Sequence, residues 1–105
     1  MRRGEVYRFR SPRGVGHEQI GERFGVVVQA DELLPRSVVL VVPTSRSARP
    51  ASFRPVVSVT GDDTRVLVEQ LGAVDAQRLG KRICQLDAQE MWAIDEALTT
   101  VLGLY

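Results

Sequence analysis

Ser37-Val-Val-Leu-Val-Val42 contains the longest unbroken apolar run of this 105-residue chain, and its β-branched residues favour a strand. The run of five apolar residues is far too short for a membrane span, which needs roughly 20. A strand without alternating polar residues is typical of the centre of a sheet, where both faces are covered. We therefore expect residues 37–42 to form a central, fully covered strand.

Shorter strand patterns lie on both sides of this segment, separated by stretches rich in Gly, Pro, Ser and Arg. A Gly-Asp-Asp sequence at residues 61–63 is typical of a turn between two strands. One helical turn is expected over residues 75–79. The strands expected from these patterns are residues 4–9, 24–30, 37–42, 56–59, 65–69 and 81–86, with residues 70–74 as a possible continuation of the fifth.

The C-terminal segment carries the signals of an amphipathic helix. Asp87 is a candidate N-cap, and Glu90 stands three residues later, in the spacing of a capping box. Gly103 is placed to end the helix. Apolar residues recur at helical spacing and predict one buried stripe. The expected stripe consists of Met91, Ile94, Leu98, Val101 and Leu102.

The composition is that of a globular domain, with 44% hydrophobic and 26% charged residues. Five to seven short strands and a terminal helix predict a small, mainly β, antiparallel barrel, formed by residues 1–105 as a single domain. Cys84 and His17 are the only residues of their types, which excludes an intrachain disulfide and a His/Cys metal cluster. We expect no cofactor, no metal, no membrane association and a cytoplasmic location.

The charge is distributed unevenly along the chain. Residues 1–55 carry ten Arg and five acidic residues, whereas residues 56–105 carry four basic and eight acidic residues. Thirteen of the fourteen basic residues are Arg, whose planar fork suits phosphate recognition. The alternative explanation for the many arginines is a genome rich in G and C, which favours Arg codons. The loops 10–23 and 44–54 are rich in Arg, and small β-barrels bind single-stranded nucleic acid with basic loops of this kind.

Seven short motifs are distributed along the chain. They are Arg3-Gly-Glu-Val-Tyr7, Gly16-His-Glu-Gln-Ile-Gly-Glu-Arg23, Val41-Val-Pro-Thr-Ser45, Val68-Glu-Gln-Leu71, Asp75-Ala-Gln-Arg-Leu-Gly80, Asp95-Glu-Ala-Leu98 and Val101-Leu-Gly-Leu104. These motifs resemble, in the same order, those of the MazF/PemK family of toxin–antitoxin ribonucleases. Two positions depart from the family pattern: Phe24 stands where the family usually has Pro, and Thr44 follows Pro43 directly where the family usually has one more residue between them.

This resemblance implies an SH3-like barrel with a C-terminal α-helix, of the CcdB/PemK type, that forms a homodimer. It also implies metal-independent, sequence-selective cleavage of single-stranded RNA, with a 2′,3′-cyclic phosphate and a 5′-OH as products. The implied partner is a cognate antitoxin that presents a disordered, acidic and apolar segment to the basic groove.

Arg23 and Thr44 are the candidate catalytic residues. Cleavage through the 2′-OH needs positive charge where the phosphorane develops, which Arg23 can supply through two parallel hydrogen bonds. The Thr44 hydroxyl can hold the attacking group in line, and Ser45 is the alternative hydroxyl. The structural alternatives are an ion pair of Arg23 with Glu22 or Glu5, and a Thr44 hydroxyl that only caps backbone in a turn.

The other candidates are assigned to RNA contact or to support of the first loop. Glu18 is a candidate for catalysis or for bracing that loop, as a partner of Arg23. A solvated side chain is the alternative for His17, and a contact with a neighbouring strand is the alternative for Gln70. The expected RNA-binding residues are Arg13, His17, Gln19, Arg46, Arg49 and Gln70.

Two competing functions share the predicted fold. A gyrase-directed toxin of the related CcdB family would cut no RNA. A non-catalytic RNA-binding barrel would show salt-dependent affinity without cleavage. The basic loops and the Gly-His-Glu-Gln…Arg signature favour the nuclease.

Overall fold

The computed structural model describes residues 1–10 and 22–105, so the expected loop at residues 10–22 lies almost wholly outside it. Seven strands and one α-helix are formed within the described residues. The strands are β1 Glu5–Arg10, β2 Glu22–Val27, β3 Val38–Ser45, β4 Val56–Val59, β5 Asp62–Val66, β6 Gly72–Asp75 and β7 Leu79–Gln85, and the helix is α1 Ala88–Leu102. Three short 3-10 helices connect them: η1 Asp31–Leu33, η2 Val68–Gln70 and η3 Ala76–Arg78.

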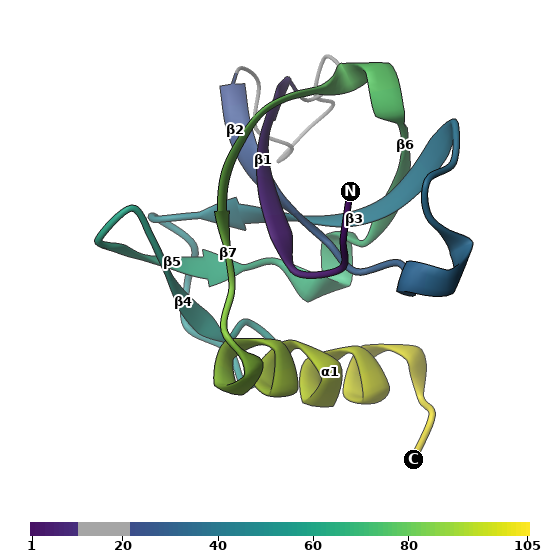
Figure 1. The fold of residues 1–105 in the computed structure, drawn as a ribbon. Coiled ribbons are helices and arrows are strands. Elements are labelled where there is room, and N and C mark those ends of the chain that lie inside the picture. The colour runs from purple at the N-terminus through teal and green to yellow at the C-terminus, as the bar shows by residue number, and fades with distance from the viewer. Residues whose placement is uncertain (11–21) are drawn as a thin grey trace.

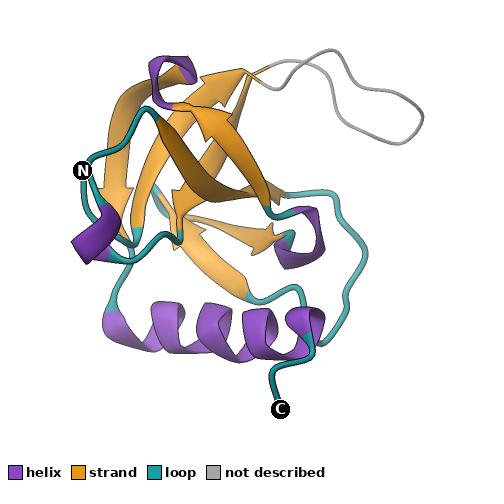
Figure 2. Ribbon diagram, turned by 90° about the vertical axis from the view of Figure 1, so that its right-hand side faces the viewer, coloured by secondary structure: helices purple, strands orange, loops and turns teal. Residues whose placement is uncertain are grey.

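The strands form one antiparallel sheet in the order β4-β5-β3-β2-β1-β7, with β6 paired to β3 beside β5. The sheet curls on itself, and α1 lies across one open side (Figures 1 and 2). The prediction of a mainly β, antiparallel barrel with a C-terminal helix is confirmed. The predicted helical turn at residues 75–79 is present as η3.

β3 is central, as predicted, but it is not covered on both faces over its whole length. Val38 and Leu40 are exposed, whereas every residue from Val41 to Ser45 is buried. Along one edge β3 pairs first with β6 and then with β5. The change of partner falls beside Pro43, which has no N–H to donate to a ladder. The curl of the sheet therefore buries the second half of β3, where the candidate hydroxyls lie.

Two other strand boundaries differ from the sequence prediction. The strand expected over residues 24–30 begins earlier and ends at Val27. The expected strand over residues 65–69 is instead β5, which starts at Asp62 and is followed by η2. The reason is the tight turn at Thr60-Gly61, both with positive φ (51° and 86°), which suits a two-residue hairpin. Asp62 and Asp63 therefore belong to a strand and not to the turn.

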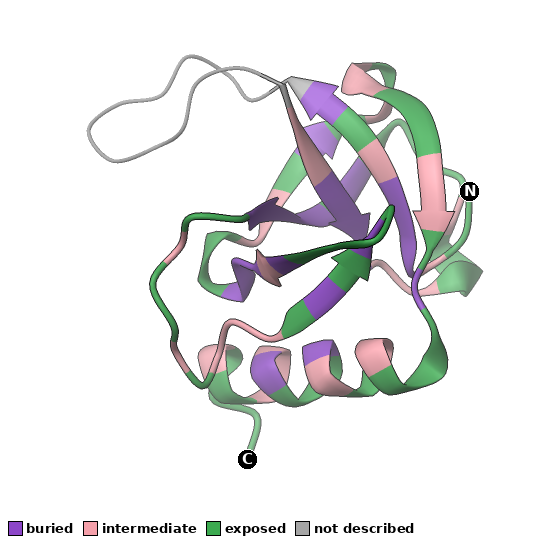
Figure 3. Ribbon diagram, turned by 90° about the vertical axis from the view of Figure 1, so that its left-hand side faces the viewer, coloured by how far each residue is buried: buried purple, intermediate pink, exposed green. Residues whose placement is uncertain are grey.

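The helix begins and ends as its sequence signals predict. Asp87 and Glu90 form the complete capping box, and Gly103 ends the helix in the left-handed conformation. The buried stripe differs from the prediction, because Leu102 is exposed and Ala97 takes its place in the core beside Ile94. Figure 3 shows the buried and partly buried residues of the helix facing the sheet. Among the described residues, no helix has the length and apolar composition that a membrane crossing requires.

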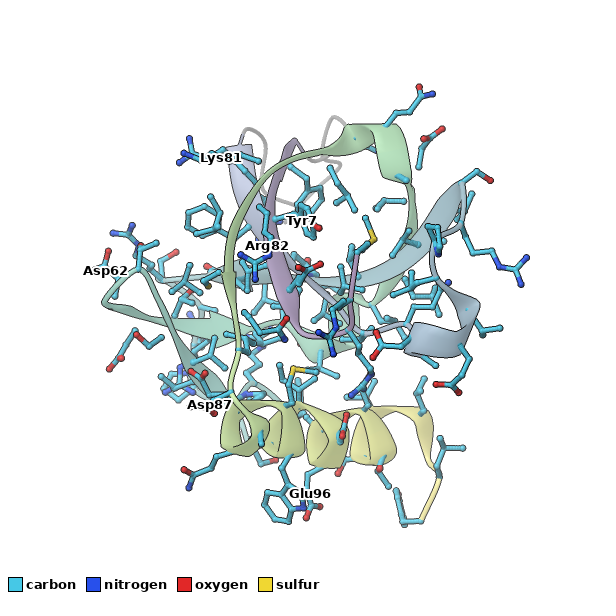
Figure 4. All side chains as sticks on the ribbon, in the orientation of Figure 1. Tyr7, Asp62, Lys81, Arg82, Asp87 and Glu96 are labelled. Carbon is cyan, nitrogen blue, oxygen red and sulfur yellow. The ribbon has the colours of Figure 1, made fainter. Side chains whose placement is uncertain are left out.

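A buried carboxylate ties β1 to β7. Glu5 is 7% exposed and accepts hydrogen bonds from Arg82 Nε, Tyr7 Oη and the Arg2 N–H. Figure 4 shows the labelled Tyr7 and Arg82 side chains next to each other in the middle of the sheet. Burial alone would raise the pKa of Glu5, but the three hydrogen bonds outweigh burial and lower it. The folded protein therefore keeps Glu5 ionised at a lower pH than the unfolded chain does.

Glu5→Gln is expected to lower the free energy of unfolding by about 1–3 kcal/mol at pH 7, because it weakens a charge-assisted buried network. The pKa of Glu5 is lowered by folding, so its contribution is complete above the usual glutamate pKa. It is lost as the pH falls through the lowered value. Urea unfolding at pH 7 and at pH 3 should show a smaller difference between variant and wild type at pH 3. An equal difference at both pH values would contradict the assignment; Glu32→Gln, at an exposed position, is the control.

Candidate functional site

A pocket of about 310 Å³ opens between five strands of the sheet. β1, β2, β3, β4 and β5 each contribute residues, so the pocket rests on paired strands. Its lining combines cations, hydroxyls, one aromatic ring and one carboxylate. The described lining residues are Arg8, Arg23, Phe24, Thr44, Ser45, Arg46, Val59, Asp62 and Thr64.

Arg23 and Thr44, the two candidate catalytic residues, converge in this pocket. Arg23 Nη2 donates a hydrogen bond of 3.2 Å to the backbone oxygen of Thr44. Arg23 Nε is buried and has no hydrogen-bond partner among the described residues. Burial lowers the pKa of Arg23, and no described carboxylate offsets that effect. A partly desolvated guanidinium with an unused donor is suited to bind an anion.

The structural alternative in which Arg23 forms an ion pair with Glu5 is wrong. Glu5 bonds to Arg82, Tyr7 and the backbone of Arg2 on the β1–β7 side of the sheet. The other partners considered from the sequence, the side chains of Glu18 and Glu22, lie outside the described part of the structure.

The two candidate hydroxyls lie in a strand and not in the loop expected over residues 44–54. Thr44 and Ser45 are the last residues of β3, paired with Val66 and Arg65 of β5. Their exposed fractions are 5% and 6%. Thr44 Oγ1 donates a hydrogen bond of 3.3 Å to the backbone oxygen of Phe24. The hydroxyl therefore bonds to backbone, as the structural alternative held, but the acceptor lies on the neighbouring strand β2 and not in a turn. The strand pairing fixes both hydroxyls at the pocket.

Phe24 and Arg8 form a wall of the pocket that the sequence interpretation did not assign to the site. The two residues are register partners on β2 and β1, and the Arg8 guanidinium lies 5.8 Å from the centre of the Phe24 ring. At the next position, a Cβ on Gly25 would come within 2.8 Å of the Phe9 ring, so only glycine fits there. Strand pairing brings Arg8 to the site, which a single sequence could not show.

Arg46 and Asp62 form an ion pair at the mouth of the pocket, 3.3 Å apart, and both side chains are more than half exposed. The sequence pattern placed Asp62 in a turn between two strands. The structure corrects this, because β5 begins at Asp62 and presents it to the pocket. A carboxylate is therefore part of an otherwise basic site.

Two further sequence candidates, Arg49 and Gln70, do not line the pocket. Arg49 is exposed, and its backbone oxygen accepts from Arg54. Gln70 is exposed in η2 and is not part of the described lining. Within residues 1–10 and 22–105, no group of three or more His, Cys, Asp or Glu is arranged to hold a metal ion. Outside the described residues lie Arg13, His17, Glu18 and Gln19.

Comparison with known proteins gives a family match over nearly the whole chain. The family described as PemK-like, MazF-like toxin of type II toxin–antitoxin system matches residues 2–102. A candidate toxin of Mycobacterium tuberculosis, Rv3098A, is 43% identical over 105 residues, which cover 97% of each chain. The endoribonuclease MazF9 of the same organism is 33% identical over 116 residues, covering all of this chain and 98% of that one. The chain is also similar to the endoribonuclease EndoA of Bacillus subtilis, with 31% identity over 99% of this chain and 96% of that one.

Solved structures share the fold. MazF from Deinococcus radiodurans superposes with a TM-score of 0.84 at 19% identity, over 98% of this chain and 96% of that one. A mycobacterial endoribonuclease in complex with its cognate antitoxin gives a TM-score of 0.82 at 20% identity, over 100% and 97% of the two chains. The family match covers well over half of the sequence, and the relatives align from end to end. The chain belongs to the PemK-like, MazF-like family of toxins of type II toxin–antitoxin systems.

Proposed function

We propose that this protein is an endoribonuclease toxin that cleaves single-stranded RNA at selected sequences without a metal ion. The observation that carries the proposal is the convergence of Arg23 and Thr44 in one pocket, where a buried guanidinium nitrogen has no partner among the described residues. A phosphodiester oxygen is an acceptor that would satisfy this donor. Two relatives, MazF9 and EndoA, are named as endoribonucleases, and this supports the same assignment.

In the proposed reaction, the ribose 2′-oxygen attacks the adjacent phosphorus and the bond to the 5′-oxygen breaks. The 2′-OH loses one proton and the leaving oxygen gains one, which leaves a 2′,3′-cyclic phosphate and a 5′-OH. Arg23 stabilises the charge that develops on the non-bridging oxygens, an effect that is strong because the group is partly buried. The Thr44 hydroxyl holds the 2′-OH or a phosphate oxygen in line for attack.

The pocket carries three guanidinium groups, and this supports RNA as the ligand. Arg8, Arg23 and Arg46 come from three different strands or their ends and surround one opening. Positive charge gathered in this way binds the phosphate backbone, with an affinity that falls as the salt concentration rises. We assign Arg13, His17, Gln19, Arg46, Arg49 and Gln70 to contacts with the RNA, and keep Glu18 and Ser45 as candidates for catalysis or for bracing the loop.

We propose that the chain acts as one domain in a cytoplasmic homodimer that a cognate antitoxin inhibits. A relative has been solved with its cognate antitoxin, which supports this regulation. An acidic, disordered segment with apolar anchors would compete with RNA for the basic pocket and become ordered on binding.

The proposal is tested by incubating the purified protein with a long single-stranded RNA in EDTA. We expect cleavage at a few defined sites, with 2′,3′-cyclic phosphate and 5′-OH ends on the fragments. Intact RNA at high protein excess would contradict the nuclease. In that case, inhibited DNA supercoiling would favour a gyrase-directed toxin, and salt-dependent RNA binding would favour a non-catalytic barrel.

A further inference from the structure

Asp62 stands out in the pocket as the one carboxylate among the described lining residues. Its neighbours there are three arginines and three hydroxyl side chains, a lining suited to phosphate. A carboxylate repels phosphate, so Asp62 does not serve backbone binding. The inference drawn from it deepens the proposed nuclease and rests on that function.

The position of Asp62 follows from the period of the strand. Side chains of β5 alternate between two faces, and Asp62 and Thr64 both line the pocket, whereas Asp63 and Arg65 do not. Figure 4 shows the labelled Asp62 at the tip of the β4–β5 hairpin, far from α1. Asp63 is therefore a matched control: it is the same residue, one position along the same strand, on the other face.

The hydrogen-bonding capacity of Asp62 is only partly used. Its Oδ2 contacts Arg46 at 3.3 Å, and no described residue bonds to Oδ1. An ionised carboxylate only accepts hydrogen bonds, so the group that it binds must donate. In RNA, the donors that single-stranded bases present are the exocyclic amino groups of guanine, cytosine and adenine, together with ring N–H groups. Uracil has no amino group, and its single ring N–H lies between two carbonyl oxygens that repel a carboxylate approaching it.

A flat surface for a base lies in the same pocket. The Phe24 ring lines it, and the Arg8 guanidinium lies over that ring. Aromatic rings and guanidinium planes are the usual stacking partners of bases in single-stranded RNA. The pocket thus combines a phosphate-binding set, Arg23 and Thr44, with a stacking surface and an acceptor.

We propose that Asp62 determines base specificity, accepting a hydrogen bond from the amino group of a base held in the pocket beside the scissile phosphate. At one position of the cleaved sequence, guanine, cytosine or adenine is favoured and uracil is rejected. Arg46 orients the carboxylate through the ion pair.

The test is single-turnover cleavage of an RNA in which each position around one mapped site is varied in turn. We expect wild type and Asp63→Asn to disfavour uracil at one position by about 10-fold, the discrimination of one good base contact. Asp62→Ala should reduce this preference to less than about 3-fold. Asp62→Asn should raise cleavage at uracil, because its amide can donate to a uracil oxygen. Asp62→Glu should keep part of the wild-type preference.

A chemical substitution in the RNA tests the same contact without changing the protein. Replacing the base at that position with its analogue that lacks the amino group, such as hypoxanthine for guanine, should slow wild-type cleavage and leave Asp62→Ala unaffected. If wild type cleaves RNA but Asp62→Ala and Asp62→Asn keep its base preference unchanged, the inference about Asp62 is overturned and the proposed nuclease function is not. Arg46→Gln removes the ion pair and keeps the carboxylate, so it should weaken the preference only in part. A loss of preference as complete as in Asp62→Ala would overturn the inference, since Asp62 would then act only through Arg46. Absence of any cleavage by wild type would overturn the proposed function and this inference together.

Discussion

Arg23→Ala is expected to slow RNA cleavage by about 100- to 1,000-fold, the usual cost of removing one preorganised donor to a developing oxyanion. The Arg23 side chain is partly buried in the pocket. Water that fills the space left by alanine cannot supply the same fixed positive charge. Arg23→Lys should restore only part of the rate, because an ammonium lacks the planar fork. The measurement is single-turnover cleavage at one mapped site, with RNA binding followed separately.

Arg36→Ala is the matched control for this prediction. Arg36 is exposed before the start of β3, at the opposite end of that strand from Thr44, and bonds only to local backbone among the described residues. Both variants lose one positive charge. A rate for Arg23→Ala within about threefold of Arg36→Ala would mean that Arg23 contributes only general charge.

Ile94→Ala is expected to lower the free energy of unfolding by about 2–5 kcal/mol, as for other large-to-small core substitutions. Ile94 has no exposed surface and joins α1 to the core residues of the sheet. Chemical denaturation followed by circular dichroism measures the loss.

Trp92→Ala serves as the control for the helix. Trp92 lies two positions earlier on α1, and 64% of it is exposed. Although it removes more atoms, Trp92→Ala should cost less than about 1 kcal/mol, because surface substitutions have small effects. An equal loss for Ile94→Ala and Trp92→Ala would contradict the core assigned to this face of the helix.

The helix could be predicted closely because its signals are local. Asp87, Glu90 and Gly103 act through contacts within a few residues, and all three do what their positions indicate. Strand boundaries depend on partners far along the chain. Val38 and Leu40 were expected to be covered, but the curl of the sheet leaves them exposed. Only the three-dimensional pairing with β6 and β5 separates the two halves of β3.

The residues of the candidate site that belong to sequence motifs could be predicted, whereas those that reach it through strand pairing could not. Arg23, Thr44, Ser45 and Arg46 were identified from motifs and loop composition, and the structure brings them to one pocket. Arg8 reaches it only because β1 pairs with β2, and Asp62 because the hairpin turns at Thr60-Gly61. Neither signal is visible in a sequence without a known register.

The central claim is that Arg23 and Thr44 act on the same phosphodiester, and a double-mutant cycle tests it most directly. Arg23→Ala, Thr44→Val and the double variant are compared in single-turnover cleavage at one mapped site, with Ser45→Ala testing the alternative hydroxyl. We expect the double variant to be slower than Arg23→Ala by less than about threefold, because groups that act as a unit are not additive. Losses that multiply, or a double variant that cleaves at the wild-type rate, would contradict the claim.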